Sequence, residues 1–190
     1  VDQLKLQRLF ADSQMSYPLN GKHTKLDVIT IDLQNQIGLV LELKWQIGGR
    51  FIKKDHVDYL KKGFGQALRA VQWIENNRTL TEQRLGLAKG SLQNCKFFPV
   101  VVAKDSLLNG LAQHDQVPLI CNRLLSYLLR KRPGDLQTLW SVTSQKTYLA
   151  LKGKHFKQEI VPTLLNNVTF QSPKTISITP WNPEADIVFP

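Results

Sequence analysis

Two charged residues, Glu42 and Lys44, interrupt a mostly apolar segment that runs from Ile37 to Trp45. If this segment is a β-strand, side chains two positions apart point to the same face, so the carboxylate and the amine project together. Placing an unpaired carboxylate among buried apolar side chains costs several kcal/mol. We therefore expect Glu42 to have a partner charge or a metal ion.

A second carboxylate, that of Asp27, is expected beside Glu42. Residues 26–32 are rich in β-branched side chains, and the short polar link 33–36 joins them to the Glu42 segment as an antiparallel hairpin. This hairpin brings the start of its first strand to the end of its second. Two carboxylates at one point suit a hard cation such as Mg²⁺ or Mn²⁺, which orients a water molecule and neutralises charge on a phosphate. Lys44 would position the attacking water or stabilise the transition state.

The elements that must hold these residues form a predicted α/β domain with a mixed central sheet and helices on both faces. The clearest is a helix over 54–77, with apolar residues at steps of three and four. Its Gly63, Gln66 and Ala70 are expected to allow a close approach between helix and sheet. The other predicted elements are a helix over 1–12, a loop over 17–21, a helix from a Thr79–Glu82 capping box to about Gly90, strands 96–103 and 117–121, helices 122–130 and 133–146, and a strand over 175–179.

Asp27, the hairpin and the tripeptide Glu42-Leu43-Lys44 resemble the D…(D/E)xK signature of the PD-(D/E)XK, or restriction-endonuclease-like, nuclease superfamily. The order of elements over about residues 1–125 resembles its αβββαβ core. The resemblance implies that Asp27 and Glu42 bind Mg²⁺ and that Lys44 is the catalytic lysine in hydrolysis of DNA phosphodiester bonds. It also implies an auxiliary catalytic role for Gln66, in the helix after the lysine.

The sequence departs from the superfamily pattern at two places. Leu26 replaces the proline that usually precedes the first aspartate, and the predicted first helix offers just Asp2 and Asp12 as the acid that many members carry there. His23, just before the Asp27 strand, is a further candidate.

Several polar residues of the long helix have an ordinary structural interpretation as well as a functional one. Gln66 lies on a helix face with Lys62 and Arg69, and it can be a solvated helix residue instead of a site residue. Lys61, Lys62 and Arg69 can likewise form a solvated face, or they can contact phosphates.

The composition favours a folded protein with a polyanionic partner. Lys and Arg total 25 against 15 Asp and Glu, a formal net charge of +10, and 42% of residues are hydrophobic. Such an excess is typical of nucleic-acid binding. Cys95 and Cys121 lack the spacing of a zinc site or disulfide framework, and the apolar run before Cys121 favours a buried free thiol there, in a protein of the cytoplasm. No apolar run of about 18 residues is present, so we expect no membrane partner.

We therefore predict a nuclease-like core over residues 1–150 and a C-terminal extension over 151–190 that packs on or near it. The leading hypothesis is a Mg²⁺-dependent or Mn²⁺-dependent nuclease acting on DNA. Two alternatives stay open, an inactive nuclease-fold module that binds nucleic acid or serves assembly, and RNA as the substrate. Other domains of a longer chain are further candidate partners.

Overall fold

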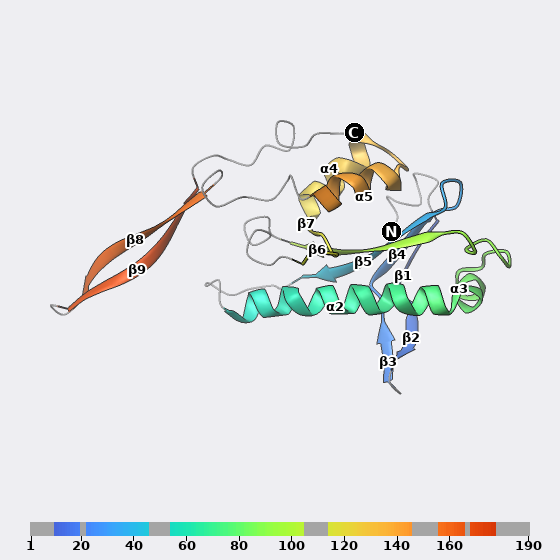
Figure 1. Ribbon diagram of the computed structural model, residues 1–190, viewed down its shortest axis with the longest axis horizontal. Coiled ribbons are helices and arrows are strands. Elements are labelled where there is room, and N and C mark those ends of the chain that lie inside the picture. Colours follow the sequence, from blue (N-terminus) through green and yellow to red (C-terminus); the bar gives the residue numbers. More distant parts are fainter. Residues whose placement is uncertain are drawn as a thin grey trace.

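The computed structural model describes residues 10–19, 22–45, 54–104, 114–145, 156–165 and 168–177. Its centre is a five-stranded sheet with the strand order β1-β4-β5-β6-β7 (Figure 1). The strands are β1 (Phe10–Ser13), β4 (Val28–Asp32), β5 (Ile37–Lys44), β6 (Lys96–Ala103) and β7 (Leu119–Cys121). β1, β4 and β5 pair antiparallel to one another, and β6 and β7 continue the sheet in parallel, so the predicted mixed sheet is confirmed.

The β4–β5 hairpin forms where the sequence predicts it. Val28 pairs with Leu41 and Asp32 with Ile37, and nearly all residues of both strands are buried. The Asp32 carboxylate orders the connecting turn, because its Oδ1 atom accepts hydrogen bonds from the backbone N–H groups of Gln34 and Asn35. This turn fixes the register of the hairpin, which in turn fixes which residues lie opposite one another at its far end.

Helices cover both faces of the sheet. α2 (Lys54–Asn76) lies along one face, and α4 (Asn122–Lys131) and α5 (Leu136–Gln145) lie on the other (Figure 1). Alternating residues of β5 divide between the two cores. Leu39 and Leu41 pack with the α4 and α5 side chains, whereas Val40 packs with the α2 side chains. By the same alternation, Glu42 and Lys44 face α2.

The predicted helix over residues 1–12 is wrong at its end, because Phe10–Ser13 form strand β1. Residues 1–9 lie outside the described residues. Phe10 pairs with Ile31 and Ser13 with Val28, so this segment completes the edge of β4. The helical spacing of the apolar residues is a local preference, and the backbone hydrogen bonds between this segment and β4 decide its structure instead.

The loop predicted over residues 17–21 is wrong for residues 17–19, since β2 (Ser16–Leu19) pairs antiparallel with β3 (Lys22–Lys25). Residues 20 and 21 lie outside the described residues. Hydrogen bonds between Gln14 and Asp27 and between Leu26 and Met15 join this pair to the β1–β4 pair. The four strands therefore form one bent ribbon. Tyr17 anchors it to α2, because its side chain is buried and its ring lies 5.2 Å from that of Trp73.

The connection from α2 to β6 differs in detail from its prediction. α3 (Arg78–Leu85) begins after Asn77 instead of at Thr79, and it ends at Gly86, whose φ of 67° is the left-handed conformation that favours glycine. Glu82 is not part of a capping box. Its buried carboxylate accepts hydrogen bonds from the backbone N–H groups of Gly90 and Leu92 and so fixes the loop that leads into β6.

The remaining elements agree with their predictions more closely. The long helix, strand β6 and the two helices after β7 are confirmed with bounds shifted by three residues or fewer. The N-cap of α4 is Cys121, whose Sγ atom accepts the Leu124 N–H, and not Asn122. Cys121 is a buried free thiol, as predicted, and so is Cys95.

The C-terminal part contains two strands, β8 (Phe156–Leu165) and β9 (Val168–Ser177), which pair antiparallel as a separate two-stranded sheet. The predicted strand over 175–179 overlaps the end of β9, and β8 was not predicted. The division at residue 150 and the packing of the extension on the core stay predictions. None of the helices in the described segments has an apolar stretch suited to crossing a bilayer.

The Glu82 carboxylate gives a test of this packing. Its two backbone hydrogen bonds hold its pKa below the ordinary value of 4.5, so its contribution to stability is present above that value and is lost as the pH falls through the native pKa. We predict that Glu82→Gln lowers the urea midpoint at pH 7 and that the difference from the wild type narrows on acidification. Glu75→Gln, at an exposed position of α2, is the control. An equal loss at every pH would contradict this assignment.

Candidate functional site

The end of β5 holds a buried ion pair on the face that α2 covers. Lys44 Nζ lies 2.6 Å from Glu42 Oε1, and the two residues are only 6% and 5% exposed. The sequence prediction that these side chains share a face is therefore confirmed. The close contact also supplies the partner charge that a buried carboxylate requires.

The hairpin register brings Asp27 to the same place. Val28 lies opposite Leu41, so the next position along places Asp27 opposite Glu42. The Asp27 carboxylate is fixed there because its Oδ2 atom accepts a 2.8 Å hydrogen bond from the backbone N–H of Leu43. The Asp27 charge acts on Glu42, so the two carboxylates lie near each other, and their shared role as metal ligands stays a prediction.

Gln66 reaches the site from α2. Its Oε1 atom accepts a 2.6 Å hydrogen bond from Lys44 Nζ, and its side chain is partly buried. The interpretation of Gln66 as a solvated helix residue is therefore wrong. The Lys44 amine is held between Glu42 and Gln66, which restricts it to one position and points two of its donors at fixed acceptors.

Two further α2 residues shape the Lys44 environment. The Lys44 amine lies 5.1 Å from the centre of the Tyr59 ring, a cation–π contact. A Cβ atom at Gly63 would come within 2.8 Å of Lys44 Cε and 3.3 Å of Val101 Cγ1. The absence of that atom lets the lysine stem lie against the helix, as the predicted close approach at Gly63 requires.

Arg69 and Tyr17 belong to the same electrostatic environment, and sequence reasoning did not place either one in the site. The positive charge of Arg69 lowers the pKa of both Glu42 and Tyr17, although burial raises each of them more. Arg69 follows Gln66 by three residues, so helical spacing alone could have indicated it. No local sequence pattern indicated Tyr17, because the pairing of distant segments in the bent ribbon brings it to α2.

Opposing effects act on the pKa of the Glu42 carboxyl group. Desolvation by burial raises its pKa above the ordinary value of 4.5, and the nearby Asp27 charge adds to the rise. The hydrogen bond and charge of Lys44 act against it. A second positive charge at the free side of the carboxylate would favour its ionised form.

The donor set fits a magnesium ion with few protein ligands. Asp27 Oδ1 and Glu42 Oε2 have no hydrogen bond to any described residue, so each carboxylate keeps an oxygen for a cation. In the described part of the chain, no group of three or more His, Cys, Asp or Glu side chains is arranged to hold a metal. Mg²⁺ accepts such a site, because it commonly binds one or two carboxylates and completes its shell with water and phosphate oxygens.

The other acidic and histidine candidates contribute less. Asp12 lies in β1 opposite Ile29 instead of in a first helix, and its Oδ1 atom accepts the N–H of Ser13. Asp2 lies outside the described residues. The backbone of His23 is in β3, opposite Pro18, and its side chain is not among those described, so its membership of the site stays a prediction.

A shallow open depression on α2 adjoins the site. It is lined by Asp58, Lys61, Lys62, Gly65, Gln66 and Arg69. Gln66 belongs to both features, because its side chain lines the depression and also holds the Lys44 amine.

Comparisons of the chain with protein-family models, with curated proteins and with solved structures find no match. A functional assignment therefore depends on the geometry of these residues.

The raised pKa of Glu42 predicts a pH effect on stability. The native protein binds a proton at Glu42 more tightly than the unfolded chain does, so this group adds stability as the pH falls from its native pKa towards 4.5. Urea unfolding across a pH series is expected to show the wild type gaining stability relative to Glu42→Gln in that window. A difference that stays flat, or that shrinks on acidification, would contradict the desolvated environment of Glu42.

Proposed function

We propose that this chain is a Mg²⁺-dependent nuclease that hydrolyses phosphodiester bonds of DNA. The observation that carries the proposal is the Lys44 amine, held between Glu42 and Gln66 beside the Asp27 carboxylate. A buried lysine with two fixed acceptors is costly to maintain for stability alone, because a pair of apolar residues would pack there at no desolvation cost.

Asp27 and Glu42 would hold the metal ion through their free oxygens. When bound, Mg²⁺ supplies Lewis-acid stabilisation of the phosphate and lowers the pKa of a coordinated water. The chain's own contribution is positional. Gln66 orients the Lys44 amine, and Lys44 donates a hydrogen bond to the attacking water or to a non-bridging phosphate oxygen, which stabilises the charge that develops there.

The order of elements supports the same proposal. In the central sheet, the antiparallel strands β1, β4 and β5 precede α2 and the parallel strand β6, with the β2–β3 pair and α3 inserted between them. This order is compatible with the βββαβ part of the core that the nuclease resemblance implies.

A second candidate is a nuclease-fold module that binds nucleic acid or serves assembly without cleaving it. The observation that favours it is the small number of ligands, since the described residues offer two carboxylates and no third acidic or histidine ligand beside them. One oxygen of Glu42 is also engaged by Lys44. This candidate predicts DNA binding that needs no metal.

Cleavage assays distinguish the two candidates. We predict that the wild type cleaves plasmid or single-stranded DNA with Mg²⁺ or Mn²⁺ and not with EDTA. Asp27→Asn and Lys44→Met are each expected to lower the rate by roughly 10²–10⁴-fold, the size typical of a positioned acid–base or charge-stabilising group. Matched controls are Asp115→Asn and Lys96→Met, at exposed positions outside the site.

Circular dichroism must show that each variant is folded. Cleavage that survives EDTA, or that is equal in the site variants and the controls, would contradict the proposal. DNA binding without cleavage under any metal condition would favour the second candidate. An RNA strand of the same sequence in the assay determines which nucleic acid is the substrate.

A further inference from the structure

We infer that the exposed side of α2 formed by Lys61, Lys62 and Arg69, here called the α2 basic surface, binds the sugar–phosphate backbone of a nucleic-acid strand and leads it to the site. The inference rests on the nucleic-acid partner of the proposed function, but not on cleavage. It assigns a binding role to cations that the sequence also allows to be an ordinary solvated helix face.

The three cations of this surface are exposed and available. All three side chains are exposed, and within the described residues none of them forms an ion pair. Asp58, at the N-terminal end of the depression, is the acidic residue among those that line it, so the surface has a net charge of two positive units. Arg69 lies against Gly65, where an added Cβ atom would come 3.1 Å from its Nη1 atom.

The α2 basic surface is continuous with the site. Gln66 lines the depression between Lys62 and Arg69, and the same side chain accepts the hydrogen bond from Lys44. The charge of Arg69 acts on Glu42. A strand held by the surface would therefore have one of its phosphates beside Gln66, the residue that holds the Lys44 amine.

The spacing of the cations fits a phosphate backbone. Lys62 and Arg69 are seven residues apart, about 10 Å along the helix axis at about 1.5 Å per residue. One strand of duplex DNA carries a phosphate about every 3.4 Å of axis, so the surface spans about three of them. The large exposed apolar side chains among the described residues are Leu33, Trp45 and Leu80, and none of them lies in α2. The surface therefore lacks the apolar anchors of a membrane-binding helix.

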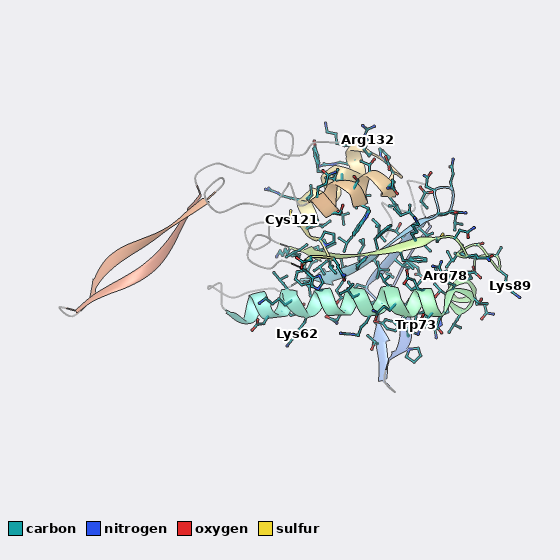
Figure 2. The ribbon with its side chains drawn as sticks, in the orientation of Figure 1. Lys62, Trp73, Arg78, Lys89, Cys121 and Arg132 are labelled. Atoms are coloured by element: carbon teal, nitrogen blue, oxygen red, sulfur yellow. The ribbon has the colours of Figure 1, made fainter. Side chains whose placement is uncertain are left out.

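The test measures binding separately from cleavage. Fluorescence anisotropy of labelled duplex and single-stranded DNA is followed in EDTA across a salt series. The triple variant Lys61→Gln/Lys62→Gln/Arg69→Gln is compared with Lys89→Gln/Lys96→Gln/Arg130→Gln, which removes the same charges from exposed positions elsewhere. Lys62 lies in the first half of α2, and Lys89 lies beyond the other end of that helix (Figure 2). Asp58→Asn, which removes the acid from the depression, is the third protein.

We expect the α2 triple variant to reduce the slope of log K against log salt by about 2.7 for duplex DNA and about 2.1 for single strands, since each phosphate contact contributes about 0.9 or 0.7. The control triple should keep the wild-type slope, and Asp58→Asn should bind more tightly. Equal slopes for the two triple variants, or no gain with Asp58→Asn, would overturn the inference. So would wild-type binding to anionic lipid vesicles without binding to DNA.

Failure of this inference and failure of the nuclease proposal look different. If the wild type cleaves DNA with metal and the α2 triple variant keeps the wild-type salt slope, the α2 basic surface does not bind DNA but the nuclease proposal stands. If the α2 triple variant has a reduced salt slope and the wild type does not cleave, the surface binds DNA but the nuclease proposal is wrong. Where both hold, Lys61→Gln/Lys62→Gln is expected to raise KM with little change in kcat.

Discussion

The structure depends on one costly interaction, the buried ion pair between Glu42 and Lys44 at the end of a strand that is otherwise apolar. Removing one partner of such a pair costs about 3–5 kcal/mol, because the other charge is left uncompensated. The pair therefore constrains its surroundings. Gly63 must stay small so that α2 can approach, and Gln66 must supply the second acceptor of the amine. These requirements add to the apolar packing of α2 against the sheet and limit which side chains the helix can present to β5.

Glu42 has a double role in this account. Its Oε1 atom neutralises Lys44, while burial and, to a smaller extent, the Asp27 charge raise the pKa of Glu42. A divalent cation between the carboxylates would lower the repulsion and favour the ionised form of Glu42. It would also weaken the ion pair between Glu42 and Lys44, so that the amine could turn towards a phosphate. Under the proposed function, a bound cation would offset the cost of keeping two carboxylates close together in a desolvated site.

The sequence was sufficient for the features that local periodicity encodes. The alternation of β5 placed Glu42 and Lys44 on one face, the short turn placed Asp27 opposite Glu42, and the apolar stripe gave α2 nearly to the residue. It failed where pairing between distant segments decides the structure. β1 pairs with the edge of β4, although its apolar residues have helical spacing. Tyr17 contacts α2 because it lies in a strand, whereas the residues around it have the composition of a loop.

We propose that Asp27 and Glu42 form a metal site beside the Lys44 amine, and the most direct test is calorimetric titration of Mn²⁺ into the folded protein. The account predicts one ion bound per chain by the wild type, loss of that binding in Asp27→Asn, and a folded protein in both cases. It also predicts tighter binding when the Lys44 charge is removed by Lys44→Met, because the amine no longer competes for Glu42. Equal Mn²⁺ binding by the wild type and Asp27→Asn, or none by either, would contradict it.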